Sequence, residues 1–240
     1  MATPVKFRAE LVRIVRHGDD VASYEFRYLD RRPRYKPGQF LHLALDAYDP
    51  ARHWPESRAF TIANGASNRE FVRLTIAAKG RFTGRLLQEL AVGRIVWMKA
   101  PYGEFIVRTA PDQEVVLIGG GTGVTPFVAF MEDALVEGIE GRVWLHYGAR
   151  HPDLLVFREL ADRCAAKFPA FASRYYAETA AAGGMVPGRI DLDAICGALT
   201  CVSAATFYLC GPQAMIDAFA ARLGSRFGVP AAHIKLDQWE

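Results

Sequence analysis

The sequence predicts two domains in succession: an antiparallel Greek-key β-barrel over residues 1–110, then an α/β domain with a parallel sheet over residues 111–240. A chain of 240 residues is long enough for two cores of ordinary size. Up to about residue 109, short strand-like runs alternate with Gly/Pro turns, whereas from Glu114 onward strand-like runs alternate with helical stretches. The segment TAPDQ, residues 109–113, lies at this change and is the expected boundary.

The first half contains seven runs in which apolar and polar residues alternate, as in half-buried strands. These runs cover residues 6–18, 21–29, 39–45, 57–64, 70–78, 94–100 and 104–108, and one helix is expected at 83–90. The segments YKPGQ and APYGEF supply turn residues between them. Short strands joined by such turns favour an antiparallel barrel over a parallel sheet.

The second half repeats the order strand, helix, strand. Strands are expected at 114–121, 142–149, 171–178, 205–211 and 233–239, and helices at 126–137, 153–167, 189–199 and 212–227. Crossovers of this kind are right-handed, so the predicted result is a parallel sheet with helices on both faces.

Composition and charge exclude several classes of protein. Hydrophobic residues make up 51% of the chain and charged residues 23%, and the net charge of +3 comes without a dense basic run that would bind nucleic acid. No apolar stretch has the length of a membrane span, and the N-terminal residues lack the apolar core of a signal peptide. We therefore expect a cytoplasmic protein with no nucleic-acid or membrane partner.

Metal centres are not expected. Cys196 and Cys201 have the first spacing of a plant-type iron-sulfur ligand set, but no third cysteine follows two residues later. The six histidines form no close pair, so His42, His53 and His146 are expected to be structural or solvated.

The segment VVLIGGGTGVTPF, residues 115–127, is the strongest chemical signal. A buried strand runs into four glycines, which would let the backbone approach a pyrophosphate, and a helix then begins at Pro126, where free N–H groups favour an anion. A tight strand-to-helix turn without a ligand is the alternative. The standard dinucleotide fingerprint differs, because Pro126 replaces its third glycine and no acidic residue ends the second strand.

Two further segments carry polar or reactive residues at strand ends. In FYLCGPQAMIDAF, residues 207–219, a strand ends at Cys210, where α/β sheets bind ligands, although a lone cysteine is more often a small buried hydrophobe. In RAFTIAN, residues 58–64, a strand pattern begins with Arg58 and carries Thr61 at its centre. This is either a plain barrel strand or one whose polar side chains hold a ligand.

In this order, the segments resemble the ferredoxin-NADP reductase family. PGQF at 37–40, RAFT at 58–61 and KGRFTGRLL at 79–87 look like the parts of its flavin site, and GGGTGVTP and CGPQAM look like its two nicotinamide-nucleotide motifs. LDQWE is similar to the family's terminal strand with an aromatic residue. The resemblance covers nearly the whole chain and implies an FAD-binding barrel followed by an NAD(P)-binding domain.

For the flavin, the resemblance implies that Arg58 pairs with the pyrophosphate and that Phe60 lies against the isoalloxazine. Thr61 would place its hydroxyl near N5, the atom that accepts hydride. The remaining flavin contacts would come from Ala59, Lys79, Gly80, Phe82 and Thr83. Without the resemblance, Arg58 is a solvated charge, Phe60 a core aromatic residue and Thr83 a helix N-cap.

For the nicotinamide nucleotide, the resemblance implies that Thr122 and Gly123 hold phosphates and that Cys210 packs near the nicotinamide as a catalytic residue, together with Thr61. Trp239 would close or flank the flavin, or else is a packed terminal anchor. The two motifs would also contribute Gly121, Pro126, Gly211, Pro212 and Met215.

Two departures from the family pattern affect cofactor binding. Phe60 stands where the family has tyrosine, which removes a hydroxyl but keeps the stacking surface. Glu178 lies where NADPH-specific relatives carry donors for the 2'-phosphate, and a carboxylate repels phosphate, so NADH is favoured over NADPH. Arg150 and Arg174 are the residues that could reach the 2'-phosphate, in which case NADPH would be accepted.

These features predict an FAD-dependent NAD(P)H reductase, acting as a monomer, that passes electrons to a separate ferredoxin, flavodoxin or oxygenase component. The alternatives are direct reduction of a small acceptor such as free flavin or a quinone, and a non-catalytic nucleotide-binding regulatory subunit. The densest basic stretch either steers an acidic carrier or is a solvated hairpin turn; it comprises Arg31, Arg32, Arg34 and Lys36.

Overall fold

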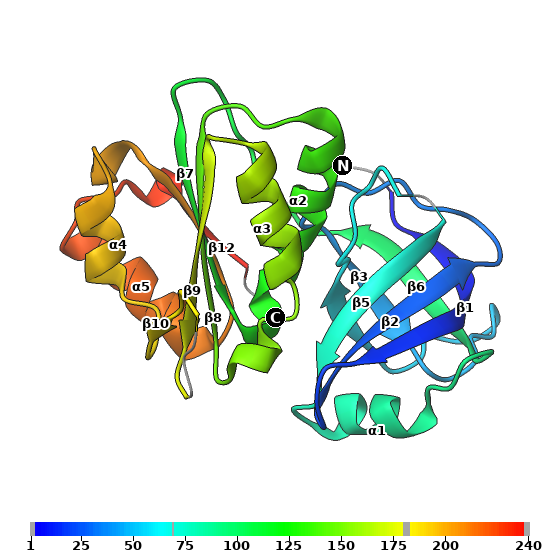
Figure 1. Ribbon diagram of the computed structural model, residues 1–240. Coiled ribbons are helices and arrows are strands. Elements are labelled where there is room, and N and C mark those ends of the chain that lie inside the picture. Colours follow the sequence, from blue (N-terminus) through cyan, green and yellow to red (C-terminus); the bar gives the residue numbers. More distant parts are fainter. Residues whose placement is uncertain (1–2, 69, 180–182, 238–240) are drawn as a thin grey trace. The chain divides into compact units, whose positions relative to one another are not determined.

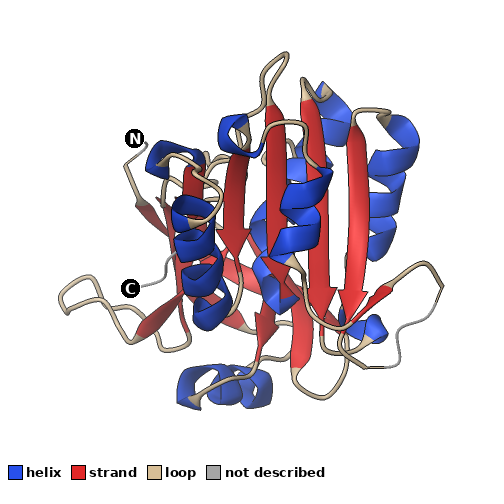
Figure 2. Ribbon diagram, turned by 90° about the vertical axis from the view of Figure 1, so that its left-hand side faces the viewer, coloured by secondary structure: helices blue, strands red, loops and turns tan. Residues whose placement is uncertain are grey.

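The computed structural model describes residues 3–68, 70–179 and 183–237. The chain divides into two compact units, residues 1–106 and 107–240, and the division falls just before the segment TAPDQ. Figure 1 shows the first unit as strands with one helix and the second as a sheet between helices. Figure 2 shows the strands of the second unit running side by side.

Six antiparallel strands form the first unit. They are β1 (Val5–Arg16), β2 (Val21–Tyr28), β3 (Phe40–Ala44), β4 (Ser57–Thr61), β5 (Phe71–Ala77) and β6 (Ile95–Tyr102). Their order in the sheet is β4-β3-β6-β1-β2-β5. The sheet nearly closes between its edge strands, because Ala63, just after β4, donates its N–H to the carbonyl of Arg73 on β5 at 2.8 Å. The predicted antiparallel barrel is confirmed.

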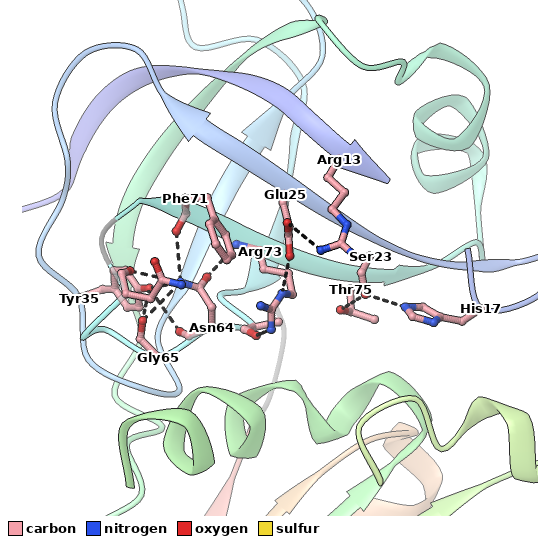
Figure 3. A network of polar contacts seen from close by, with 12 residues as sticks. Arg13, His17, Ser23, Glu25, Tyr35, Asn64, Gly65, Phe71, Arg73 and Thr75 are labelled. Atoms are coloured by element: carbon pink, nitrogen blue, oxygen red, sulfur yellow. Dashed lines mark hydrogen bonds and ion pairs between the residues drawn. The ribbon is translucent and has the colours of Figure 1, made fainter. Parts of the chain in front are cut away.

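Asn64 makes this closure a fully paired polar junction (Figure 3). Its Oδ1 accepts the N–H of Arg73 at 2.7 Å, and its Nδ2 donates to the carbonyl of Phe71 at 3.2 Å and to the hydroxyl of Tyr35 at 2.9 Å. The side chain is completely buried, so these partners replace water. Asn64 thereby ties the loop that carries Tyr35 to the end of β4.

Apolar side chains from alternate strand positions fill the barrel. Those exposed by 2% or less include Phe7, Tyr24, Phe26, Leu41 and Met98. Burying one such side chain contributes about 1.5–3 kcal/mol. The apolar core therefore holds the barrel together without help from Arg58 and Thr61 of the RAFTIAN segment.

Residues 104–108 do not form a strand, and that prediction is wrong. Gly38, at φ +94°, approaches this segment so closely that a Cβ would lie 1.9 Å from the carbonyl oxygen of Phe105. The N–H of Ile106 donates to the carbonyl of Glu104 at 2.9 Å. This bond makes a tight turn at residues 104–106, and no residue of 104–108 belongs to a strand, although Phe105 is buried as a strand residue would be.

Six parallel strands form the sheet of the second unit, and its predicted fold class is confirmed. They are β7 (Glu114–Gly120), β8 (Arg142–Ala149), β9 (Phe171–Ala177), β10 (Val186–Pro187), β11 (Thr206–Cys210) and β12 (Ile234–Leu236), in the order β10-β9-β8-β7-β11-β12. The chain moves from β7 to β8 and β9 and then returns to the other side of β7. This reversal brings the carboxyl ends of β7 and β11 together, where open α/β sheets bind ligands. The two-residue strand β10 was not predicted.

Helices cover both faces of this sheet (Figure 1): α2 (Thr125–Glu137) and α3 (Arg158–Lys167) on one, α4 (Leu192–Ala198) and α5 (Gln213–Ser225) on the other. The predicted start of α3 is wrong, because residues 152–154 form a separate 3-10 turn. Asp191 caps α4 by accepting the N–H of Asp193 at 2.9 Å, so residues 189–191 stay outside the helix. Each helix that the structure describes falls short of the length and apolarity that crossing a bilayer demands.

Candidate functional site

The two glycine-containing motifs of the second unit meet at the carboxyl ends of β7 and β11. Gly119 and Cys210 are register partners across these strands. Gly123 packs on the second motif, since a Cβ there would lie 2.5 Å from the carbonyl oxygen of Cys210 and 2.5 Å from the nitrogen of Gly211. Only glycine fits at such distances. The predicted nucleotide residues Gly123, Cys210 and Gly211 are therefore brought together by direct backbone contact.

Gly120 and the start of α5 complete this contact. A Cβ on Gly120 would lie 2.8 Å from Cδ of Pro212 and 3.3 Å from Sδ of Met215. Gly211, at φ +152°, approaches the nitrogen of Gly120 so that a Cβ would lie 3.0 Å away. Pro212 is exposed and Met215 is half-buried, so the predicted residues of the second motif form one wall of the glycine-rich turn.

The glycine-rich turn enters α2 through a 3-10 turn, Gly121–Val124. Gly121 has φ +57°, a left-handed conformation that favours glycine. The carbonyl of Thr122 accepts the hydroxyl of Thr125 at 2.9 Å, and Pro126 is buried in the first turn of α2, where its missing N–H costs nothing. The first N–H groups of this helical segment have no partner within it, which makes them donors for phosphate.

Cys210 is buried and hydrogen-bonded. Its Sγ donates to Oδ2 of Asp237 at 3.1 Å, and the residue is 2% exposed. Burial raises the pKa of the Cys210 thiol, and the charge of Asp237 raises it further. Burial also raises the pKa of the Asp237 carboxyl to about 6. The thiol therefore stays protonated and serves as a donor and packing surface, not as a nucleophile.

Sequence reasoning missed Asp237. Its N–H donates to the carbonyl of Leu209 at 3.0 Å, so it extends the pairing of β12 with β11 and lies beside Cys210. The available signal was position, because Asp237 lies near the carboxyl end of the strand predicted at 233–239, and residues at such strand ends face the ligand crevice. Trp239, the predicted neighbour of the flavin, lies outside the described residues.

Glu178 directly follows β9, at the carboxyl edge of the same sheet. Its Oε2 lies 3.1 Å from Nε of Arg189, and the Arg189 side chain is 84% exposed. An exposed pair of this kind contributes only about 0–1 kcal/mol, so the carboxylate remains available to a ligand. Arg150 and Arg174, the predicted alternatives for binding a phosphate, have no acidic partner in the described part of the chain.

His146 and His42 are packed among other side chains. His146 is buried, its Nδ1 lies 3.0 Å from the hydroxyl of Tyr176, and burial lowers its pKa to about 4. Burial also lowers the pKa of His42, with Lys99 adding to the effect. Within residues 3–68, 70–179 and 183–237, no three His, Cys, Asp or Glu side chains gather where a metal ion would fit.

In the first unit, β4 does not present all of its predicted flavin residues on one face. Cross-strand register pairs Phe60 with buried Leu41 and Thr61 with Phe40, and side chains alternate along a strand, so Arg58 and Phe60 lie on one face and Thr61 on the other. Thr61 is 6% exposed, and its hydroxyl has no hydrogen bond within the described ranges. Ala59, half-buried, shares the face of Thr61.

Arg58 and Phe60 gather instead around Phe82 of α1 (Arg81–Glu89). The ring centroids of Phe60 and Phe82 are 6.4 Å apart, and the guanidinium carbon of Arg58 lies 5.4 Å from the centroid of Phe82. Three predicted flavin residues from two separate motifs thus meet at the N-terminus of one helix.

Positive groups surround the start of α1. Oε1 of Glu56 lies 3.2 Å from Nη2 of Arg58 and 3.4 Å from Nη2 of Arg81, so two guanidinium groups flank one carboxylate. The first turn of α1 contains no acidic residue. A Cβ on Gly80 would meet nothing within 4 Å, so the backbone is open to a ligand there. Helix N–H groups and two arginine forks are the donors that a pyrophosphate requires.

Thr83 shapes this turn. Its Oγ1 accepts the N–H of Lys79 at 2.9 Å and of Gly80 at 3.0 Å, and it donates to the carbonyl of Gly80 at 3.1 Å. These bonds start α1 at Arg81, two residues before the predicted start at Thr83. The hydroxyl of Thr83 therefore holds the exposed residues Lys79 and Gly80 in place for a ligand.

The chain is similar in sequence to known oxidoreductases. Residues 117–221 match the family described as oxidoreductase NAD-binding domain. The chain is 34% identical over 145 residues, 60% of its length, to the phenol 2-monooxygenase reductase component DmpP of Pseudomonas sp. (strain CF600). It is 29% identical over 230 residues, 94% of its length, to the ferredoxin–NAD(P)+ reductase component of the naphthalene 1,2-dioxygenase/salicylate 5-hydroxylase systems of Ralstonia sp..

In sequence and in fold, the chain is similar to oxidoreductases of the ferredoxin-NADP reductase type. It spans 39% of the phenol monooxygenase component and 69% of the naphthalene dioxygenase component. The fold of this chain also matches a crystal structure of a ferredoxin NADP+ reductase from Neisseria gonorrhoeae, with a TM-score of 0.77 and 17% identity, over 97% of this chain and 98% of that one. The matched family is described as an oxidoreductase domain, in agreement with the predicted class, and the Neisseria structure holds FAD and NADP, the predicted cofactors.

Proposed function

We propose that this chain is an FAD-dependent NAD(P)H reductase that delivers electrons to a separate oxygenase component or to a carrier such as a ferredoxin. Both relatives described above are named as reductase components of oxygenase systems, and the Neisseria structure contains FAD and NADP. The chain spans only 39% of the first of these relatives, so the activity of that relative cannot simply be carried over. The proposal therefore depends on the residues of this chain.

The observation that carries the proposal is the backbone contact between Gly123 and Gly211, with the Cys210–Asp237 pair beside it. This contact leaves helix N–H groups for phosphates and a buried, protonated thiol at one strand end. Such a surface orients a nicotinamide without offering a competing nucleophile. Thr122 and Gly123 would hold the phosphates, and Cys210 would pack near the ring.

The first unit has the donor set for FAD. Arg58, Arg81 and the N-terminus of α1 would hold its pyrophosphate, and Phe60 would flank its ring. The flavin itself supplies a ring that accepts hydride and releases electrons one at a time. Thr61 lies on the opposite face of β4, and its hydroxyl forms no hydrogen bond with any described residue. This hydroxyl would be the group that reaches the flavin near N5.

A visible spectrum of the purified protein tests the proposal. We expect bound flavin, and we expect NADH or NADPH added without oxygen to bleach its absorbance. A protein that stays colourless after FAD is added would overturn the proposal. If the protein reduced a quinone but reduced no carrier protein, the small-acceptor alternative would be favoured.

Glu178 makes the proposed choice of nucleotide testable. Its carboxylate would accept from a ribose hydroxyl and repel a 2'-phosphate, so we propose NADH as the preferred donor. We expect Glu178→Ser to raise the ratio of kcat/KM for NADPH to that for NADH about tenfold, or ~1.4 kcal/mol. Glu140→Ser, an exposed site on the same unit, is the control. An unchanged ratio in Glu178→Ser would remove the argument for NADH.

A further inference from the structure

One loop of the first unit carries cations that no described acidic side chain neutralises. Eight other arginines of this unit form ion pairs: Arg8, Arg13, Arg27, Arg52, Arg58, Arg73, Arg81 and Arg85. Arg31, Arg32, Arg34 and Lys36 have no acidic partner among the residues that the structure describes. We call these four residues the basic loop.

The acidic residue next to the basic loop does not neutralise it. Asp30 is bound to Arg8 by three hydrogen bonds, of 3.0, 3.0 and 2.8 Å. The Arg8 guanidinium lowers the pKa of Asp30 to about 2. The carboxylate of Asp30 is thus paired with Arg8 of β1, and the cations of the basic loop are left for another partner.

The basic loop is extended and displays its cations outward. Arg32 and Lys36 each precede a proline, which disfavours helical backbone for them. Exposure alternates along the segment, with Arg32, Arg34 and Lys36 exposed and Pro33 and Tyr35 half-buried. Side chains two apart on an extended chain share a face at a spacing of about 6–7 Å. The three cations therefore form a row.

The basic loop is also held in place. The hydroxyl of Tyr35 donates to the carbonyl of Gly65 at 3.0 Å and accepts from Asn64, as Figure 3 shows. At its end, the N–H of Lys36 donates to Oε1 of Gln39 at 2.9 Å, and the amide of Gln39 donates to the carbonyl of Gly103 at 2.9 Å. A preorganised surface loses less conformational entropy when a partner binds.

A small pocket opens between the cations. It has a volume of about 70 Å³ and is lined by Tyr28, Arg32, Pro33, Arg34, Tyr35, Ala66 and Asn68. Arg32 and Arg34 both belong to its walls. Arginine forks at a concave site select a carboxylate, which they can bind by two parallel hydrogen bonds.

The basic loop leads directly to the end of β4 where Thr61 lies. The carbonyl of Gln39 accepts the N–H of Ile62 at 3.0 Å, and the next residue, Phe40, pairs with Thr61. Arg58, predicted to hold the pyrophosphate, lies toward the other end of this strand. A protein bound to the basic loop would therefore lie on the side predicted for the flavin ring.

We infer that the basic loop is the docking surface for an acidic electron-carrier protein, with a carboxylate of that carrier seated between Arg32 and Arg34. The inference builds on the proposed function, which requires such a carrier. Complementary charge of this kind acts mainly on the rate of association and can change it by about 10- to 1,000-fold.

The test uses an acidic [2Fe–2S] ferredoxin as the probe and the FAD-loaded full chain. Arg32→Glu/Arg34→Glu is compared with Arg16→Glu, which alters an exposed cation at the end of β1, away from the basic loop. Ferredoxin binding is measured by titration calorimetry, and ferredoxin reduction is measured at two salt concentrations. Reduction of menadione, a neutral quinone, measures electron flow without a carrier protein.

We expect the double variant to raise KM and Kd for the ferredoxin at least about tenfold at low salt, and to lose most of the salt dependence. Menadione turnover and flavin content should stay within about twofold of the unmodified protein, and Arg16→Glu should change KM less than about twofold. Equal effects of the two substitutions, an unchanged Kd, or failure of the unmodified protein to bind the ferredoxin would each overturn the inference.

The binding measurement separates this inference from the proposed function. If the protein reduces neither menadione nor ferredoxin, the proposed reductase activity is wrong. Ferredoxin binding that still depends on Arg32 and Arg34 would nevertheless support the docking surface. Normal menadione turnover together with ferredoxin binding that is insensitive to both arginines would leave the activity standing and remove the docking surface.

Discussion

The two units present their candidate ligand groups in opposite ways. In the barrel, the groups are side chains: Arg58 is exposed, Phe60 is half-buried, and both lie at an edge strand near the start of α1. In the α/β unit, the groups are mainly backbone, brought together by Gly123 and Gly211 at distances that exclude any Cβ. Substituting a candidate ligand residue in the barrel should therefore weaken ligand binding without changing stability. In the α/β unit, the same kind of substitution should affect both ligand binding and stability.

Substituting Gly123 by alanine should have the largest effect. The new Cβ would lie 2.5 Å from backbone atoms of Cys210 and Gly211, which cannot move aside as a flexible side chain can. We expect unfolding free energy to fall by about 1–3 kcal/mol or more and nucleotide-dependent flavin reduction to be lost. Denaturant titration and stopped-flow reduction would measure both effects.

Gly224→Ala is the matched control for this substitution. Gly224 lies in α5, and a Cβ there would meet nothing within 4 Å. We expect this variant to be more stable by about 0.5–1 kcal/mol, because alanine replaces glycine inside a helix. A Gly123→Ala variant as stable and as active as the Gly224→Ala variant would contradict the backbone contact.

Asp237 tests the α/β side of the comparison, because its carboxyl group is buried beside Cys210, whereas Arg58 of the barrel is exposed. The pKa of Asp237 is raised from 3.8 to about 6, so the native state holds a proton that the unfolded chain has released between these values. Its contribution to stability is thus fully present below about pH 4 and is lost as pH rises through about 6, by ~3 kcal/mol. We expect Asp237→Asn to show a weaker fall in unfolding free energy over this interval, measured by denaturation at several pH values. Parallel pH profiles for the two proteins would count against a buried carboxylate.

Arg58→Ala tests the barrel side of the comparison. The Arg58 side chain is 54% exposed and its partner is a surface carboxylate, so unfolding free energy should change by less than about 0.5 kcal/mol. Loss of a charged hydrogen bond to pyrophosphate should weaken FAD binding by about 10- to 100-fold. Flavin release during dialysis and fluorescence titration would measure this loss. Arg52→Ala, another exposed arginine with an ion pair, is the control and should leave FAD affinity unchanged.

Phe60→Tyr should have the smallest effect. Phe60 packs against Phe82 with a tilted ring, and a phenol keeps this surface while restoring the family's hydroxyl. We expect FAD to stay bound, with its affinity changed by less than about threefold, or its potential slightly shifted. Absorbance and fluorescence titration would measure this. Loss of flavin from this variant would mean that the ring lies elsewhere.

Much of the molecule could be predicted from local patterns. Alternation of strands and helices after Glu114 predicted the parallel sheet, and VVLIGGGTGVTPF and FYLCGPQAMIDAF predicted which strand ends would face a ligand. The apolar alternation that predicted a strand at 104–108 was misleading, because it reports burial and does not report which backbone groups are paired. At 58–61, alternation alone already implied that Arg58 and Thr61 face in different directions.

The sequence by itself determined the two fold classes, the strand-end positions of Arg58 and Cys210, and the presence of glycine where close approach is needed, because these depend on residue type and local spacing. Only the tertiary structure decided that the carboxylate of Asp237 accepts a hydrogen bond from Cys210 and that the hydroxyl of Thr83 binds its own turn. It also decided that the basic loop has no acidic partner in the part of the chain that is described. Strand order, register and capping bring together groups that are distant in the chain. A periodic pattern carries no information about which distant group will be the partner.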